Sequence, residues 1–319
     1  RAVMDDARAY SRRLVERRLA RLPDAIVTHE ETLDGDGISA AAPCVRVRID
    51  KRGTHLAVDF AGSSPCVAGP INAPFAVTAS AVYYTLLLLA GGDVPPNAGV
   101  YAAASISAPA ASLVNAVEPY PVVAANTETS NRLVDILLAA LAQAYPERVP
   151  AGSYGSACVY TLGGIDPRQG RRFVHYETIG GGAGATPLAA GASGMRVHMG
   201  NTMNLPIEAT EAAIPVRYLA YEIVRETGGG GWRGGGGGVR KSLEALADGI
   251  EASILGERTL TPAHGVGGGQ AGRCARFILQ RAGGTDRVLP AKSGPHRLAC
   301  GDRIEMMTAG GGGWGTVRR

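Results

Sequence analysis

Hydrophobic and polar positions alternate with two different periods in the first part of the chain. Over residues 1–21 the apolar positions recur at helical spacing with arginines between them, which predicts an amphipathic helix. Over residues 45–49 and again over residues 56–60, apolar and polar residues alternate one by one. A short turn containing Gly53 separates these two runs, so the pattern predicts a β-hairpin.

Two more helices are expected before residue 150. Asn72 is a suitable N-terminal cap for a helix that runs through the tyrosine and leucine residues to Gly91-Gly92. Apolar residues return at helical spacing over residues 133–144. Either Thr127 or Thr129 is expected to cap this second helix.

The pattern changes after Pro150, where short apolar runs alternate with glycine-rich loops. These runs predict strands rather than helices because they are short and bounded by glycine. A chain of 319 residues is also long enough for two lobes. We therefore expect an α/β (α+β) protein with a mixed α/β lobe at residues 1–150 and a β-rich, glycine-loop lobe at residues 151–319. The strands expected in the second lobe are residues 173–179, 216–224, 250–255 and 277–280.

Three glycine tracts stand out in the second lobe, at residues 180–185, 228–238 and 310–315, and most of the 45 glycines lie between residues 180 and 315. Glycine permits positive φ and close approach of a backbone or a ligand. A nucleotide loop is not indicated, because no GxxxxGK[ST] occurs and the first tract lacks a following helix with a suitably placed acidic residue. Tight backbone packing is one interpretation. The other is that the amides of Gly181, Gly182 and Gly184 face a substrate.

Composition narrows the possible partners and location. A net charge of +4, scattered along the chain, does not indicate a nucleic-acid partner. The longest apolar run, near residues 81–90, is too short to span a bilayer, so no membrane partner is expected. Five scattered cysteines without a CxxC pair fit a reducing cytoplasm. The chain begins with Arg1, and we expect further sequence upstream.

Neither a metal site nor a catalytic serine is predicted. The histidines at positions 175, 198, 264 and 296 lack the spacing typical of zinc or non-haem iron ligands. Ser153 and Ser156 lie outside any G-x-S-x-G elbow, so turn formation explains them better than nucleophilic catalysis.

The segment from His198 to Glu211 is the best candidate for chemistry. It brings one imidazole, amides, hydroxyls and carboxylates within fourteen residues, a set that could orient a polar ligand and transfer protons. We expect His198, Glu208 and Glu211 to be catalytic, with Asn201 and Thr202 binding the substrate. The alternative is a loop whose polar side chains satisfy backbone groups.

A second polar cluster precedes the helix at residues 133–144. Asn126, Glu128 and Thr129 could bind a substrate, or they could form only the capping box of that helix. Arg233, between two glycine runs, could bind an anion or bridge loops.

Several of these segments, in this order, resemble the hydantoinase B (HyuB) family, whose relatives include 5-oxoprolinases and acetone or acetophenone carboxylases. The resemblance covers nearly the whole chain but only the C-terminal part of the longer family members. The matching segments are residues 58–64, 69–72, 95–99, 126–150, 176–182, 198–211, 233–235 and 310–315. Two departures are Ala190-Gly191, where the family often has an aspartate before glycine, and Ala309, where it often has proline.

The resemblance implies ATP-dependent ring opening of a small cyclic amide such as a hydantoin or 5-oxoproline. It further implies a hetero-oligomer in which a HyuA-type ATPase subunit supplies the ATP site. A divalent metal is possible in the family, but no residue here is assigned to it. The alternatives are a subunit of an ATP-dependent ketone carboxylase and an inactive assembly module.

Overall fold

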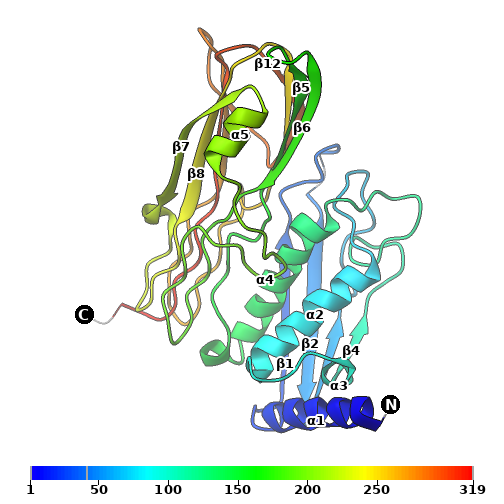
Figure 1. The fold of residues 1–319 in the computed structure, drawn as a ribbon. Helices are drawn as coiled ribbons and strands as arrows, with labels where there is room; N and C mark the ends of the chain where they lie inside the picture. Colours follow the sequence, from blue (N-terminus) through cyan, green and yellow to red (C-terminus); the bar gives the residue numbers. More distant parts are fainter. Residues whose placement is uncertain (1, 41, 318–319) are drawn as a thin grey trace. The chain divides into compact units, whose positions relative to one another are not determined.

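The chain forms two compact units, as a computed structural model that describes residues 2–40 and 42–317 shows (Figure 1). The first unit contains the residues up to Thr32 together with Pro43–Pro150. The second unit contains Leu33–Ala42 and the residues from Ala151 onward. The division after residue 150 coincides with the predicted boundary, but residues 33–42 belong to the second unit, which the sequence pattern did not indicate.

A four-stranded sheet organises the first unit. Its strands are β1 (Ala25–Thr32), β2 (Cys44–Arg52), β3 (His55–Asp59) and β4 (Ala104–Ser107), in the order β1-β2-β3-β4. The predicted hairpin is confirmed as β2 and β3, and Gly53 in its turn has a φ of +53°. Strand β4 pairs parallel to β3, so a crossover must connect them.

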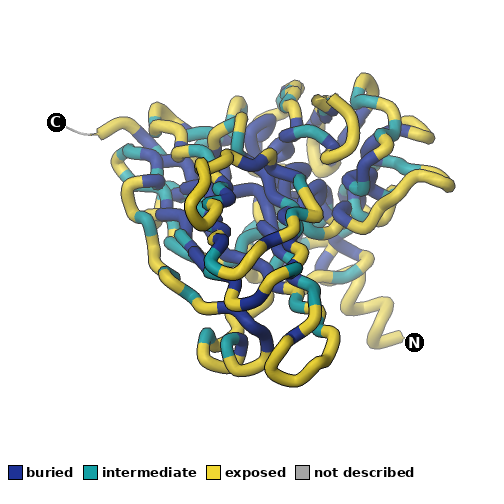
Figure 2. The backbone as a smooth tube through the Cα atoms, turned by 90° about the horizontal axis from the view of Figure 1, so that it is seen from above, coloured by how far each residue is buried: buried dark blue, intermediate teal, exposed yellow. Residues whose placement is uncertain are grey.

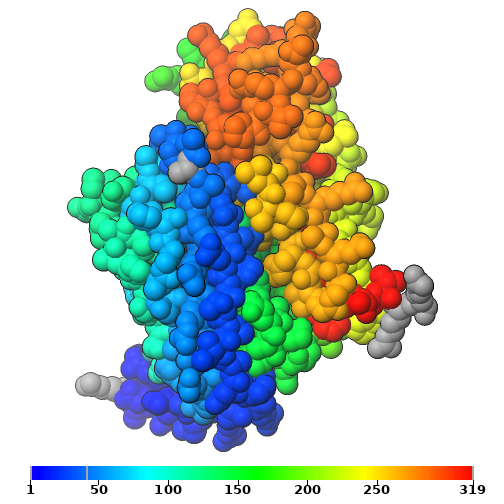
Figure 3. Space-filling view, turned by 180° about the vertical axis from the view of Figure 1, so that it is seen from behind, coloured from blue at the N-terminus to red at the C-terminus, as the bar shows by residue number. Residues whose placement is uncertain are grey.

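Four α-helices accompany this sheet: α1 (Ala2–Leu19), α2 (Phe75–Ala90), α3 (Ala98–Tyr101) and α4 (Ser130–Ala142). Helix α4 packs on α2 and on strands β1 and β2, and nearly all of its side chains are buried. Helix α1 packs on α3 and is otherwise largely exposed, as Figure 2 and the dark blue segment in Figure 3 show. No helix of residues 2–40 and 42–317 is long and apolar enough to cross a membrane.

The predicted cap of α2 is wrong, whereas Thr129 occupies the N-cap position of α4 as predicted but makes no capping hydrogen bond with its side chain. Pro74 occupies the N-cap position of α2, and the side chain of Asn72 instead bonds the backbone of a loop, including Val67 N at 2.8 Å. A π-helical turn (Ala125–Thr129) leads directly into α4. Thr129 Oγ1 donates to Ile71 O at 2.5 Å rather than capping the helix. A 3-10 turn (Pro146–Arg148) ends the unit.

The second unit is a β-sandwich. One sheet has the order β11-β10-β13-β8-β7 and the other the order β12-β9-β5-β6, and side chains of both share one hydrophobic core. The four predicted strands are confirmed as β6, β7, β9 and β10. The bounds are β5 (Val159–Asp166), β6 (Arg171–Thr178), β7 (Val216–Val224), β8 (Gly238–Ala245), β9 (Ile250–Leu255), β10 (Arg276–Gln280), β11 (Arg287–Leu289), β12 (Lys292–Leu298) and β13 (Arg303–Met307). Helix α5 (Ile207–Ala213) precedes β7, and a 3-10 turn (Arg225–Thr227) follows it.

The glycine tracts form extended segments that continue the sandwich strands and lie side by side (Figure 1). Gly182 N donates to Ala309 O at 3.0 Å, Gly236 N to Ala183 O at 2.9 Å, and Gly311 N to Gly236 O at 2.9 Å. A Cβ on Gly182 would lie 2.1 Å from Gly236 O, closer than any real contact. These positions require glycine because another backbone occupies the space of a side chain.

Two neighbouring glycines allow this packing to be tested. A Cβ on Gly235 would lie 2.0 Å from Gly311 O, whereas a Cβ on Gly234 would meet only Gly229 O at 3.8 Å. We expect Gly235→Ala to lower the free energy of unfolding by at least about 2 kcal/mol, because a backbone must move. Gly234→Ala should change it by less than about 0.5 kcal/mol. Equilibrium urea unfolding measures both, and equal effects would contradict close packing.

Candidate functional site

The segment after His198 is irregular and largely exposed. His198 is half-buried and has a φ of 51°, a left-handed conformation that is uncommon for residues other than glycine. Asn201 and Thr202 are exposed, and so is Glu208 in the first turn of α5. These side chains are accessible to a ligand in the second unit.

Glu211 lies at the other end of this segment and has a positioning role. Its Oε1 accepts a hydrogen bond from the backbone N of Tyr218 at 2.7 Å, which ties α5 to the following strand β7. The guanidinium of Arg168 donates to the backbone O of Glu211 at 3.1 Å. These contacts hold Glu211 at the start of β7, so we keep it as a residue that orients Tyr218.

The predicted glycine amides already have protein partners. Gly181 N donates to Met195 O at 3.1 Å, and Gly182 N donates to Ala309 O at 3.0 Å. A Cβ on Gly184 would lie 1.8 Å from Ala151 O. Backbone packing therefore accounts for these three positions, and we do not include them in the proposed site.

Arg233 lies beside both tryptophans of the chain. Its guanidinium carbon is 4.4 Å from the centre of the Trp232 ring, and its backbone pairs with that of Trp314. The two indole rings are 6.0 Å apart. This arrangement bridges two glycine segments, which is one of the two roles expected for Arg233.

The cluster before α4 belongs to the first unit. Asn126 is exposed, and its backbone O accepts a hydrogen bond from Ser130 Oγ at 2.7 Å. Glu128 and Thr129 are fully buried. Nearby, the buried guanidinium of Arg132 donates to Glu31 Oε1 at 2.9 Å. The cluster thus has a structural function at the start of α4, and its role in substrate binding stays a prediction.

The sequence patterns did not reveal a second cluster, which lies in the core of the sandwich around Glu177. Lys241 Nζ donates to Glu177 Oε1 at 2.5 Å, and the side chains of both residues are almost completely buried. The Tyr160 hydroxyl donates to Glu177 Oε2, and His175 Nε2 lies 3.2 Å from the same oxygen. The Tyr218 hydroxyl lies 2.8 Å from that of Tyr160.

Three aromatic rings surround the ammonium group of this cluster. Lys241 Nζ lies 5.2, 5.0 and 4.6 Å from the ring centres of Tyr160, Tyr218 and Tyr221, respectively. Cation–π attraction adds to the ion pair because the rings replace water around the charge. Since Glu177 comes from β6 and Lys241 from β8, the pair joins the two sheets of the sandwich.

The surroundings favour an ionised Glu177. Burial alone would raise its pKa, but hydrogen bonds from His175, Lys241 and Tyr160 outweigh burial and lower the pKa to about 2. Burial lowers the pKa of Lys241, and its hydrogen bond to Glu177 opposes this shift. Burial and the Glu177 charge raise the pKa of Tyr160, and burial raises that of Tyr221 to about 12. The phenols therefore keep their protons at neutral pH, and the cluster fixes charge rather than transferring protons.

Strand periodicity contains a signal for this cluster. Phe173, His175 and Glu177 occupy alternate positions of β6, and Phe173 packs against the core, so the two polar residues share its face. On β8, Lys241 similarly lies between the core residues Val239 and Leu243. Polar residues at core-facing strand positions indicate a buried network.

A metal centre is not evident in the part of the chain that the structure describes. Within residues 2–40 and 42–317, no group of three His, Cys, Asp or Glu side chains is arranged to hold a metal ion. We therefore derive no step through a metal.

Removing the charge of Glu177 should destabilise the second unit. Glu177→Gln leaves the Lys241 ammonium buried without a counter-charge, so we expect a loss of about 3–5 kcal/mol in the free energy of unfolding. The double variant Glu177→Gln, Lys241→Met should recover most of that loss. Urea unfolding measures the free energy of unfolding of both variants. If the effects of the two substitutions simply added in the double variant, the result would contradict the pairing.

The pH dependence follows from the lowered pKa. A carboxylate with a folded pKa of about 2 and an ordinary value of 4.5 contributes its full stabilisation above pH 4.5. This contribution is lost as the pH falls from about 4.5 to about 2. Between these pH values the free energy of unfolding should therefore decrease less in the double variant than in the wild type. Urea unfolding at a series of pH values measures this difference.

Known proteins match this chain over nearly its whole length. The sequence model of the hydantoinase B/oxoprolinase family matches residues 1–317. 5-Oxoprolinase 1 of Arabidopsis thaliana is 33% identical over 298 residues, which are 93% of this chain and 22% of that protein. The B component of a D-/L-hydantoinase of a Pseudomonas species is 30% identical over 327 residues, covering 98% of this chain and 54% of that protein.

Two solved structures have the same fold. The ATP-dependent caprolactamase of Pseudomonas jessenii superposes with a TM-score of 0.86 and 26% identity, over 99% of this chain and 56% of that one. Nucleotide-free acetone carboxylase gives a TM-score of 0.79 at 17% identity, over 96% of this chain and 47% of that one, a likeness of fold alone. The chain thus spans 22% to 56% of the length of these four proteins. It belongs to the hydantoinase B/oxoprolinase family.

Proposed function

We propose that this chain is part of an ATP-dependent hydrolase that opens a small cyclic amide, such as a hydantoin or 5-oxoproline. The observation that carries the proposal is the match to an ATP-dependent caprolactamase over 99% of the chain at a TM-score of 0.86. Caprolactam is itself a cyclic amide. The 5-oxoprolinase and hydantoinase relatives support the same reaction class.

A division of labour between two subunits is chemically reasonable. An amide resists hydrolysis because resonance makes its carbonyl carbon a weak electrophile, and phosphorylation of its oxygen removes that resistance. No P-loop motif occurs in this chain, and the amides of Gly181 and Gly182 are already bonded within the protein. We propose that a HyuA-type ATPase subunit binds the ATP, in a hetero-oligomer with this chain.

His198 is the proposed proton-transfer residue of this chain. It is half-buried at the start of an exposed polar segment, and strained non-glycine residues are concentrated at functional sites. Asn201, Thr202 and Glu208 are the exposed polar side chains that would orient the amide and the attacking water. The buried Glu177–Lys241 pair would keep β6 and β8 of the same unit rigid.

Carboxylation of a ketone is the alternative activity. The fold likeness to acetone carboxylase favours it, but that likeness extends to fold alone, at 17% identity. Both reactions need ATP. The two activities can therefore be distinguished by which substrate, a cyclic amide or a ketone, stimulates ATP consumption.

Reconstitution with the ATPase subunit provides the test. We expect stoichiometric ATP consumption and ring-opened product with hydantoin, 5-oxoproline or caprolactam, and none with acetone plus bicarbonate. Phosphate release and product analysis by mass spectrometry measure the two outcomes. ATP consumption that depends on the ketone would contradict the proposal and support the carboxylase.

His198→Ala should lower kcat in the same complex by about 100-fold or more, because a positioned acid or base contributes that much. His55→Ala, an exposed histidine on β3 of the first unit, is the matched control and should leave kcat unchanged. Wild-type kcat in His198→Ala would remove the residue from the mechanism without affecting the proposed reaction.

A further inference from the structure

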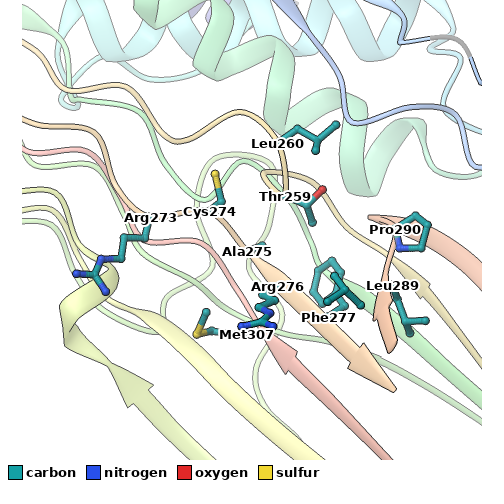
Figure 4. A pocket seen from close by; sticks show the side chains of 11 residues that line it. Thr259, Leu260, Arg273, Cys274, Ala275, Arg276, Phe277, Leu289, Pro290 and Met307 are labelled. Atoms are coloured by element: carbon teal, nitrogen blue, oxygen red, sulfur yellow. The ribbon is translucent and has the colours of Figure 1, made fainter. Parts of the chain in front are cut away.

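A pocket of about 530 Å³ lies in the second unit, away in sequence from the His198 segment. Its walls come from Thr259-Leu260, the start of β10, residues 288–290 and the end of β13. Figure 4 shows Phe277, Leu289 and Pro290 toward one side, Arg273 on the opposite side, and Arg276 with Met307 between them. The volume is in the range of small-molecule sites.

The two sides of this pocket differ in polarity. The apolar lining that a ligand can reach comes from the exposed side chains of Leu260, Val288 and Pro290, because Phe277 and Leu289 are buried core residues. Arg273 and Arg276 are exposed, and no acidic side chain lines the pocket. Within residues 2–40 and 42–317, neither guanidinium makes a hydrogen bond or an ion pair. The pocket therefore combines an apolar region with two positive charges that lack counter-charges in the described chain.

The loop that forms one wall is held in place. The backbone N and Oγ1 of Thr259 both donate to Asp34 Oδ2, the latter at 2.8 Å, and Leu260 N donates to the same oxygen at 3.1 Å. Because these hydrogen bonds to Asp34 hold the loop in place without a ligand, this wall of the pocket is preformed. A preformed pocket costs less ordering on binding.

We propose that this pocket binds an amphipathic monocarboxylate, a small molecule with one carboxylate and an aliphatic or aromatic body. Guanidinium groups match carboxylates in geometry and charge, and they would replace the missing counter-charges. The apolar body would cover Leu260 and Val288, which are 75% and 60% exposed, and burial of their apolar surface adds affinity. The same charges disfavour a cation of equal size. This site does not rest on the proposed hydrolase activity.

Octanoate, below its critical micelle concentration, is the probe for the full chain. Isothermal titration calorimetry should show one saturable site for octanoate, and at least about tenfold weaker binding of octan-1-ol, octylammonium and acetate. The double variant Arg273→Gln, Arg276→Gln should bind octanoate no more tightly than octan-1-ol. Leu260→Ser should weaken octanoate and octan-1-ol alike, because Leu260 lines the pocket and is 75% exposed.

Arg171→Gln is the matched control. Arg171 is an exposed arginine of the same unit that does not line this pocket, so octanoate affinity should stay at the wild-type value. Thermal unfolding midpoints verify that each variant is folded. Absence of a saturable octanoate site would overturn the proposal. So would equal affinity for octanoate and octan-1-ol, or octanoate binding that the double arginine variant leaves unchanged.

Discussion

Close contact between bare backbones is the constraint on which the second unit depends. Gly182, Gly236 and Gly311 come from three distant parts of the sequence, and the backbone of another segment occupies the place of a side chain at each. A Cβ would lie 2.1 Å from Gly236 O at Gly182, 1.9 Å from Ala192 O at Gly236, and 2.0 Å from Ala183 O at Gly311. Buried backbone groups need hydrogen-bond partners, and extended segments cannot supply them internally. The three segments therefore bond to one another, and this is possible only because no Cβ keeps them apart.

This packing also fixes the buried ion pair. Glu177 lies three residues before Gly180, and Lys241 lies three residues after Gly238. The glycine segments thus determine where β6 ends and where β8 begins, and hence where the two charges meet between the sheets. The charged pair in turn joins the two sheets at a point where an uncompensated charge would be costly. The packing of the glycine segments and the Glu177–Lys241 ion pair therefore depend on each other.

Local patterns in the sequence were sufficient for elements that have a regular period. Helix α1 and the β2–β3 hairpin follow from periodicity, and strands β7 and β9 follow from short apolar runs between glycine-rich loops. The hydrogen-bond partners of the Asn72 and Thr129 side chains could not be predicted, because distant backbone atoms compete for these side chains. Strand β8 was missed because it directly follows a glycine tract that obscures its alternation. Pairing across sheets is a long-range property, so the Glu177–Lys241 contact was also missed.

In the proposed enzyme the glycine segments are scaffold, and the His198 segment meets the substrate. Hydrogen exchange of the reconstituted complex, with and without a cyclic amide, tests this assignment. We expect residues 180–184 and 309–313 to exchange slowly in both states, while substrate changes the exchange of residues 198–206. Substrate-dependent protection confined to the glycine segments would contradict the assignment.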